Sequence, residues 1–213
     1  MNENSRFWNH GTEEEWKRAL KHYYEMMEAR SHEEVALDRF MENLRAEEVK
    51  AMPVEAFYTF LYDKYFVWKF TQKNYLANCR KNLRRYVEEG DLLTLADIQK
   101  RLFDTNHSLI QSCFKTAEEI HGLGTAGASG LLAILFPEDF GTVDQFVVKT
   151  LSEIEGISHE AELAKLNPNS LTTKGGVVLT KIFREKAKEL NTNFGTDFWT
   201  PRKIDMVLWA YGR

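Results

Sequence analysis

The chain has 213 residues, of which 43% are hydrophobic and 28% are charged, and its formal net charge is −4 at pH 7. This length can bury a full core, and this composition is typical of a globular protein and favours neither a disordered nor a fibrous one. No apolar run approaches the roughly 20 residues that cross a bilayer, and the N-terminal residues lack the apolar core of a signal peptide. We therefore expect a soluble, cytoplasmic monomer without a membrane partner, associated with the nucleoid if its source is bacterial.

The cysteines and histidines do not form the patterns of a metal site. Cys79 and Cys113 are too few for a four-thiolate zinc site or an iron–sulfur cluster, and a reducing compartment would keep them as buried thiols. The six histidines show no paired ligand spacing. The sequence therefore predicts no metal cofactor.

Three helix starts can be identified in the first quarter of the chain. Thr12 precedes Glu15 by three residues, and Ser31 precedes Glu34 likewise, so each pair matches the capping box. Pro53 predicts a third start, because proline is common in the first turn of a helix. A stripe at helical spacing follows it and comprises Phe57, Phe60, Leu61, Lys64, Tyr65 and Trp68. We interpret this stripe as core, with a base-stacking platform as the alternative.

The basic residues concentrate in one stretch. Residues 53–88 carry 7 basic and 3 acidic groups, whereas the segments on either side each have four more acidic than basic groups. Lys69, Lys73, Arg80 and Arg84 would share one face of a continuous helix, because their offsets are 4, 7 and 4. Such a face suits a DNA phosphate backbone. A solvated helix face is the alternative.

Helical periodicity continues to the C-terminus. It predicts helices over residues 72–88, 94–103, 108–120, 125–136, 143–154, 176–190 and 201–211. No alternating strand pattern extends beyond a few residues. The predicted fold class is therefore all-α.

A tight glycine turn joins the helices predicted at 108–120 and 125–136. Gly122 and Gly124 allow positive φ and close approach of another backbone, while Leu123 can fill the space between the helices. The amides at the start of the second helix suit a phosphate oxygen without any basic side chain. After this helix, a loop containing Pro137 and Gly141 leads to Thr142, Val143 and Asp144.

This order of features resembles the helix-hairpin-helix DNA glycosylase superfamily, which includes endonuclease III and the adenine glycosylases. Ile-His-Gly-Leu-Gly resembles the Leu-Pro-Gly-Val-Gly hairpin of that family, with His121 in place of proline, and the likeness is specific over residues 114–154. It implies two helical lobes with double-stranded DNA in the cleft between them, without the iron–sulfur cluster of endonuclease III. It also implies DNA contacts by His121, Gly122, Leu123, Gly124, Thr125 and Ala126.

The same resemblance divides the chain and permits one bound ion. The single unit of residues 1–213 would have one lobe made of 1–105 with 190–213, and a second lobe made of 106–189 that carries the hairpin, 114–136. A monovalent cation at the hairpin carbonyls is compatible with the family.

Asp144 aligns with the catalytic aspartate of this family. Bifunctional members place a nucleophilic lysine two residues after the second hairpin glycine, where this chain has Ala126. The resemblance therefore implies a monofunctional DNA N-glycosylase with absent or weak lyase activity, in which aspartate stabilises charge at the sugar and helps to activate water. The alternative is that Asp144 only caps the helix that follows it.

Base excision also needs a wedge and a pocket that holds the extruded base. The sequence does not select among the aromatic candidates, which are Trp8, Trp16, Tyr58, Tyr62, Trp68, Phe198 and Trp199. Arg202 and Lys203 begin the last helix, an arrangement that a bound phosphate would favour and that solvent exposure also explains. Three functions stay open: a glycosylase, a non-catalytic DNA-binding module and an all-α protein-interaction scaffold.

Overall fold

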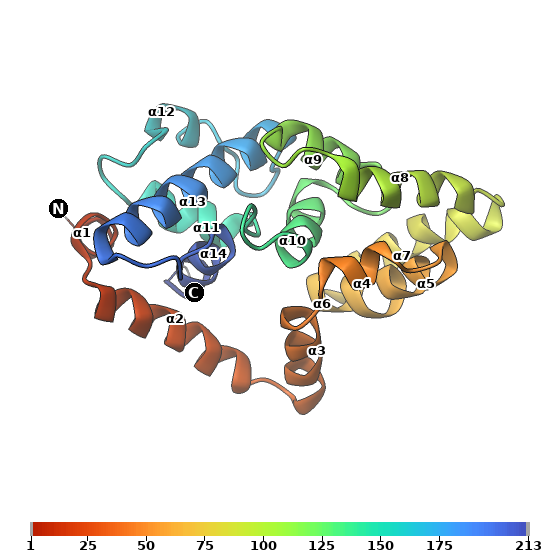
Figure 1. The fold of residues 1–213 in the computed structure, drawn as a ribbon, viewed down its shortest axis with the longest axis horizontal. Helices are drawn as coiled ribbons and strands as arrows, with labels where there is room; N and C mark the ends of the chain where they lie inside the picture. Colours follow the sequence, from red (N-terminus) through yellow and green to blue (C-terminus); the bar gives the residue numbers. More distant parts are fainter. Residues whose placement is uncertain (1, 212–213) are drawn as a thin grey trace.

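The computed structural model describes residues 2–211, and every regular element in that range is a helix (Figure 1). The first α-helices are α1 (Glu3–His10), α2 (Glu13–Glu28), α3 (His32–Glu42), α4 (Ala46–Lys50), α5 (Val54–Phe60), α6 (Phe66–Lys69), α7 (Lys73–Glu88) and α8 (Leu92–Asp104). The later ones are α9 (Ile110–Glu118), α10 (Thr125–Leu135), α11 (Gln145–Ser152), α12 (Glu160–Leu163), α13 (Thr173–Phe194) and α14 (Pro201–Tyr211). The predicted all-α class is confirmed. None of these helices is long and apolar enough to cross a membrane.

The two predicted capping boxes begin α2 and α3. The Thr12 hydroxyl accepts a hydrogen bond from the Glu15 N–H at 3.3 Å, and the Glu15 carboxylate accepts one from the Thr12 N–H at 2.8 Å. Ser31 and Glu34 make the same exchange at α3. Each pair satisfies amides that have no acceptor within the helix. Pairs of residues three positions apart therefore determine where α2 and α3 begin.

The helix predicted after Pro53 is divided into three parts. α5 passes into a π-helical turn, Leu61–Tyr65, which passes into α6. Phe70 then leaves the helical region, with φ of −110° and ψ of 88°. The core interpretation of the aromatic stripe is confirmed for its buried members, which are Phe57, Phe60, Leu61 and Tyr65. Lys64 is exposed and Trp68 is half-buried.

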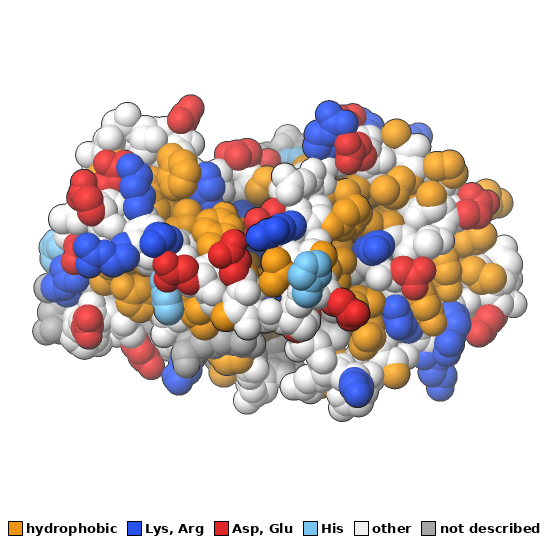
Figure 2. Space-filling view, turned by 90° about the horizontal axis from the view of Figure 1, so that it is seen from below, with side chains coloured by type: hydrophobic (Ala, Val, Ile, Leu, Met, Phe, Trp, Pro, Cys, Tyr) orange, Lys and Arg blue, Asp and Glu red, His pale blue; other side chains and the backbone are white. Residues whose placement is uncertain are grey.

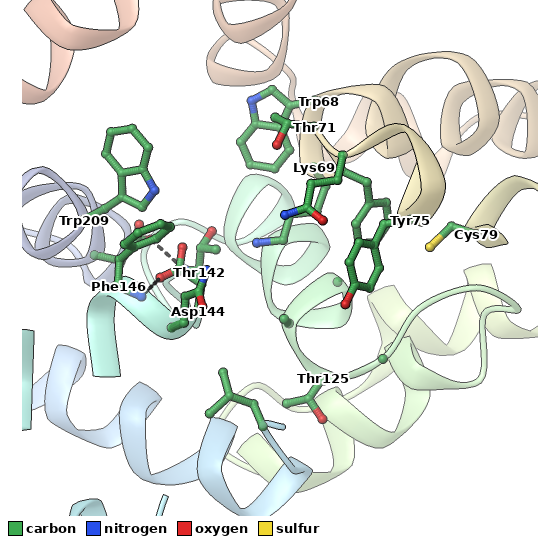
Figure 3. Close-up of a pocket in the computed structure, with 18 of the residues that line it drawn as sticks. Trp68, Lys69, Thr71, Tyr75, Cys79, Thr125, Thr142, Asp144, Phe146 and Trp209 are labelled. Carbon is green, nitrogen blue, oxygen red and sulfur yellow. Dashed lines mark hydrogen bonds between the residues drawn. The ribbon is translucent and has the colours of Figure 1, made fainter. Parts of the chain in front are cut away.

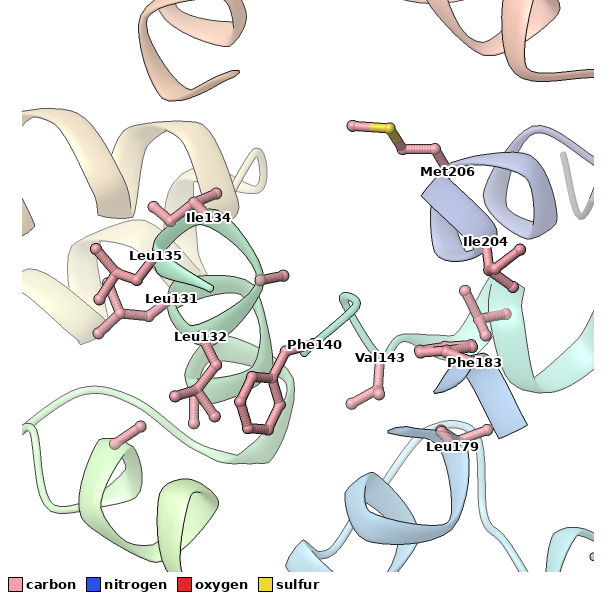
Figure 4. Close-up of a cluster of buried hydrophobic side chains, with 14 of the residues drawn as sticks. Leu131, Leu132, Ile134, Leu135, Phe140, Val143, Leu179, Phe183, Ile204 and Met206 are labelled. Atoms are coloured by element: carbon pink, nitrogen blue, oxygen red, sulfur yellow. The ribbon is translucent and has the colours of Figure 1, made fainter. Parts of the chain in front are cut away.

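α10 is the central helix of the core. It is apolar on all sides, and such a helix is stable only when other elements surround it. It packs against α9, α13 and α14. Figure 4 shows Leu132 of α10 beside Phe140, while Leu131 and Leu135 extend from the opposite side of the helix. Buried apolar side chains thus fix α10 in the middle of the molecule.

The N-terminal helices pack against the C-terminal ones (Figure 1). Trp16 of α2 lies edge-on to Trp199 before α14, with ring centroids 5.6 Å apart. The Lys186 amine of α13 donates to the Trp8 carbonyl oxygen at 2.9 Å. Trp8, Trp16 and Trp199 are all buried. These three tryptophans therefore belong to the core and hold the two ends of the described chain together.

Candidate functional site

A pocket of about 720 Å³ lies between α6, the glycine hairpin, the start of α11 and α14 (Figure 3). Pockets for small ligands commonly have volumes of about 300–1,000 Å³. The hairpin contributes Gly122, Gly124, Thr125, Ala126 and Gly127 to its lining. The other polar and charged lining residues include Lys69, Asp144, Arg202 and Asp205. The pocket therefore brings the hairpin and Asp144 to one place.

The two hairpin glycines have different structural roles. Gly122 has a φ of +96°, and a Cβ atom there would lie 2.6 Å from the carbonyl oxygen of Cys79. Gly124 is exposed and has extended backbone with φ of −98°, and a Cβ atom added there would meet nothing within 4 Å. Leu123 between them is buried against Gly127. The fold requires glycine at 122, while Gly124 leaves an open approach to α10.

The start of α10 has no side-chain cap. Its first backbone hydrogen bond runs from the Ala128 N–H to the Gly124 carbonyl oxygen at 2.8 Å. The first three amides of an α-helix precede this bond and have no acceptor within the helix. The residues that carry these amides line the pocket. They form a site of partial positive charge without any cationic side chain.

Side chains from three helices hold the hairpin in place. The Glu118 carboxylate accepts hydrogen bonds from the hydroxyls of Thr125 at 2.6 Å and Thr173 at 2.8 Å. The His121 ring stacks on Tyr86 with ring centroids 4.1 Å apart, and the backbone N–H of His121 donates to the Tyr86 hydroxyl at 3.2 Å. His121 is thus packed against α7 on the side of the hairpin.

Asp144 is the N-cap of α11 and lines the pocket. Its Oδ1 accepts hydrogen bonds from the N–H groups of Phe146 at 2.9 Å and Val147 at 3.0 Å. Within residues 2–211, no hydrogen bond is made to its Oδ2. The predicted capping role is confirmed, and it occupies one of the two carboxylate oxygens.

Two buried side chains fix the loop that leads to Asp144. The Ser129 hydroxyl of α10 accepts from the Val143 N–H at 3.0 Å and donates to a carbonyl of its own helix at 2.8 Å. Asp205 of α14 accepts from the Thr142 N–H at 2.6 Å. Leaving a buried N–H without its acceptor costs about 1–3 kcal/mol. These bonds therefore set the position of Asp144 relative to the hairpin.

Arg202 and Asp205 form a buried ion pair beside this loop. Arg202 Nη1 lies 2.9 and 3.0 Å from the two Asp205 oxygens and donates to the Thr142 hydroxyl at 3.1 Å. Burial raises the pKa of Asp205 to about 6, although Arg202 and the Thr142 N–H act in the opposite direction. Lys203 donates to a nearby backbone carbonyl at 2.7 Å. Both basic residues at the start of α14 thus have partners within the protein.

Lys69 enters the pocket from the end of α6 (Figure 3). Its stem packs against Gly130 of α10, where a Cβ atom would lie 3.0 Å from Lys69 Cδ. Burial lowers the pKa of Lys69 to about 8 from its ordinary value of 10.5, although the charges of Asp144 and Asp205 act in the opposite direction. In the part of the chain that the structure describes, its amine makes no hydrogen bond or ion pair.

Aromatic side chains from several separate elements line the pocket. They are Tyr23, Trp68, Phe70, Tyr75, Phe146 and Trp209, of which Figure 3 labels Trp68, Tyr75, Phe146 and Trp209. The Trp68 indole donates to Asp38 at 2.6 Å, which fixes its orientation. Tyr75 is 60% exposed, so its ring is available to a ligand. The pocket therefore offers aromatic surfaces to a ligand.

Trp68 is the aromatic candidate from the sequence that lines this pocket. Tyr58 and Tyr62 stack on each other with ring centroids 5.9 Å apart, and Phe198 is partly exposed at another site. The sequence analysis missed the other aromatic lining residues, which are Tyr23, Phe70, Tyr75, Phe146 and Trp209. Phe146 follows Asp144 by two residues, and this proximity was a signal that could have found it. No comparable sequence signal points to Tyr75 or Trp209, because only the packing of distant helices brings these two residues to the pocket.

The predicted basic face is divided between two helices. Its proposed members are Lys69, Lys73, Arg80 and Arg84. The chain leaves the helical region at Phe70, so Lys69 points into the pocket from α6 while the other three lie on α7. Lys73 is exposed, and Arg80 lies 3.6 Å from Asp63. The continuous helix that would align all four residues is not formed.

Both cysteines are buried free thiols, as the sequence predicts. Burial raises the pKa of Cys113 to about 11. Residues 2–211 contain no group of three or more His, Cys, Asp or Glu side chains placed to hold a metal ion. A monovalent cation at the hairpin carbonyls stays a prediction.

Comparison with protein-family models, with curated proteins and with solved structures finds no match for this chain. The pocket itself brings helix amides, a carboxylate, an amine and aromatic rings together around one cavity.

Proposed function

We propose that the protein is a DNA N-glycosylase that holds double-stranded DNA by the hairpin of residues 114–136 and uses Asp144 to remove one altered base. The observation that carries this proposal is that Asp144 and the uncapped start of α10 line the same pocket. The resemblance of residues 114–154 to the helix-hairpin-helix glycosylases supports the same assignment.

The DNA backbone would bind at the hairpin. Amides at a helix start, together with the helix dipole, favour a phosphate oxygen. A Cβ atom added at Gly124 would meet nothing within 4 Å, so the space beside this residue is open for a phosphate. Contacts to phosphates position a protein on the duplex without reading its sequence. Binding of the phosphates at the hairpin would thus determine which nucleotide lies opposite the pocket.

The altered base would leave the stack and enter the aromatic pocket. Enzymes that act on a base rotate it out of the duplex and hold it between apolar or aromatic side chains. Trp68, Tyr75, Phe146 and Trp209 supply such surfaces around a volume of about 720 Å³. A base in this pocket would bring its deoxyribose close to Asp144.

Hydrolysis breaks the bond between C1′ and the base nitrogen, and the bonding electrons leave with the base. The Asp144 carboxylate would stabilise the positive charge that develops at C1′. A water molecule adds at C1′, and its proton passes to Asp144 and then to solvent. Ala126 offers no amine at the hairpin position, so water is the nucleophile of this step.

The test is a panel of DNA duplexes that each carry one altered base, followed by alkaline cleavage of any abasic product. We expect cleavage of at least one duplex, and an Asp144→Asn variant should lose about 100-fold or more in rate. Asn caps helices as well as Asp does, so the melting temperature should stay nearly constant. Asp104→Asn, on an exposed site of α8, is the matched control. Full activity in Asp144→Asn would contradict the assignment.

A non-catalytic DNA-binding module is the second candidate. The capping bonds of Asp144 favour it, because they explain this residue without any chemistry. It predicts salt-sensitive DNA binding with no product from any duplex of the panel. The absence of DNA affinity at low salt would instead favour a protein-interaction scaffold.

A further inference from the structure

Lys69 differs from the other deeply placed lysine, Lys186. The Lys186 amine donates to the Trp8 carbonyl at 2.9 Å and to Glu189 at 2.7 Å, so its charge is compensated within the protein. The Lys69 amine has no such partner among the described residues and faces the pocket. An ammonium withdrawn from water without a partner destabilises a fold. Structural need therefore does not account for Lys69.

The surroundings of Lys69 direct its amine at the pocket. Gly130 has no side chain, and this leaves room for the Lys69 stem against α10. The Tyr65 hydroxyl fills the remaining space and donates to the Gly127 carbonyl. In Figure 3 Lys69 and Asp144 extend into the pocket from different elements. An amine is thus held in the cavity that contains the carboxylate.

We propose that Lys69 is an amine nucleophile that captures the aldehyde of an abasic deoxyribose in this pocket. This inference rests on the proposed function, because removal of a base beside Asp144 would generate that sugar in place. It assigns a lyase step to a lysine on α6, in contrast to the absent or weak lyase activity that Ala126 implies.

The chemistry of this step balances without a cofactor. The Lys69 nitrogen adds to C1′ of the ring-opened sugar, and loss of water gives a protonated imine. A base then removes a proton from C2′, and the bond between C3′ and its oxygen breaks. The 3′ phosphate group leaves with the bonding electrons, and hydrolysis of the imine returns the free amine. The neighbouring Asp144 carboxylate can accept the C2′ proton.

The protonation state of Lys69 suits this role. With a pKa of about 8, about one tenth of the amines are neutral at pH 7, roughly two orders of magnitude more than for an ordinary lysine. The charged groups around the amine are Asp144, Asp205 and Arg202. The two carboxylates favour the ammonium form, whereas Arg202 and burial favour the neutral amine.

The experiment uses the full chain and a duplex that contains a preformed abasic site. Sodium borohydride reduces any imine to a stable amine, and peptide mass spectrometry locates the modified residue. We expect a covalent complex through Lys69 that forms faster as the pH rises from 6.5 towards 8. Lys69→Arg and Lys69→Gln should each lower its yield at least ten-fold. Lys100→Ala, on an exposed site of α8, should leave the yield unchanged.

Three results would overturn the proposal: no complex with the wild-type chain, a complex through another amine, or undiminished trapping by Lys69→Gln. If both variants fail to fold, the mass spectrum of the wild-type complex still decides. The preformed site separates this inference from the glycosylase proposal. A trapped complex without release of any base would support the role of Lys69 and contradict the glycosylase proposal. Release of a base without a trapped complex would support the glycosylase proposal and contradict the role of Lys69.

Discussion

Asp144 uses its two carboxylate oxygens differently. Oδ1 accepts both hydrogen bonds from the start of α11, while Oδ2 accepts none within the described residues. A single oxygen is enough to cap a helix, so the second can act in the pocket. Capping also holds the side chain in one orientation, and catalysis requires such preorganisation.

Removal of the cap should be measurable as a loss of stability. Asp144→Ala deprives the N–H groups of Phe146 and Val147 of their acceptor, so the free energy of unfolding should fall by about 1 kcal/mol. Asp144→Asn should change it by a few tenths at most. Urea denaturation of both variants measures the difference. Equal losses would show that the carboxylate charge, and not the cap, is the source of stability.

Lys69 should lower the stability of the fold at neutral pH. Its pKa of about 8 lies below the ordinary value of 10.5, so between these values the unfolded chain binds more protons than the folded chain. The free energy of unfolding therefore rises with pH across this interval, and the full penalty is present below pH 8. Lys69→Met should raise the free energy of unfolding at pH 7 by on the order of 1 kcal/mol.

Lys69→Met should also reduce the increase in the free energy of unfolding between pH 7 and 9.5. Thermal melting at a series of pH values measures this change. Lys186→Met is the matched variant. It should be destabilising, because it leaves the Trp8 carbonyl and the Glu189 carboxylate without their donor. A Lys69→Met variant that is less stable than wild type at pH 7 would refute this interpretation.

At the scale of elements, the two hairpin glycines should have different effects when they are replaced. Gly122 is needed for folding, whereas Gly124 is expected to matter for DNA binding. Gly122→Ala should lower the free energy of unfolding by about 2 kcal/mol, because φ is +96° and the added Cβ would meet the Cys79 carbonyl. Gly124→Val should cost about 1 kcal/mol or less, because its backbone is extended and its surroundings are open.

Gly124→Val is the variant that tests DNA binding at the hairpin. A valine side chain at 124 would occupy the approach to the α10 amides, so affinity at low salt should fall at least ten-fold. Fluorescence anisotropy with a labelled duplex measures it. Unchanged affinity in a folded Gly124→Val protein would mean that the phosphate does not bind at this helix start.

The loop between α10 and α11 depends on one hydroxyl. Ser129→Ala leaves the buried Val143 N–H without an acceptor, which should cost about 1–3 kcal/mol of stability. It should also lower the rate of base release, because the loop positions Asp144. Thr180→Val is the control, since the buried Thr180 hydroxyl has no hydrogen-bond partner among the described residues and its loss should be nearly neutral. Denaturant titration and single-turnover assays measure both effects.

At the scale of the whole molecule, charges of both signs are mixed on the face drawn in Figure 2. On α7, Arg85 lies 2.9 Å from Glu89 and Arg84 lies 3.9 Å from Glu88. Ion pairs of this kind reduce the number of side chains that can neutralise phosphates. DNA binding would then depend largely on the hairpin amides.

This distribution predicts a shallow salt dependence. Each neutralised phosphate contributes a slope of about −0.9 to the plot of log affinity against log salt concentration, and we expect a total of about −2 to −4. Equilibrium binding between 50 and 300 mM salt, controlled with Lys100→Ala, gives this slope. A slope steeper than about −7 would indicate an extended basic surface and would contradict this prediction.

The sequence by itself determined the features that depend on neighbouring residues. The capping boxes at Thr12 and Ser31, the turn at Gly122 and the cap at Asp144 all involve groups within a few positions of one another. Helical periodicity likewise predicted the all-α class and most helix ranges. Hydrogen bonds and steric limits at this range act in any tertiary context, so they can be inferred from the order of residues.

Only the tertiary structure decided what surrounds Asp144. The break at Phe70, which periodicity did not predict, separates Lys69 from α7 and leaves it in the pocket. Tyr75 and Trp209 reach the same cavity from elements more than 100 residues apart. These neighbours result from burial of apolar side chains around α10, a non-directional force that acts between residues of any separation. No local pattern in the sequence records its outcome.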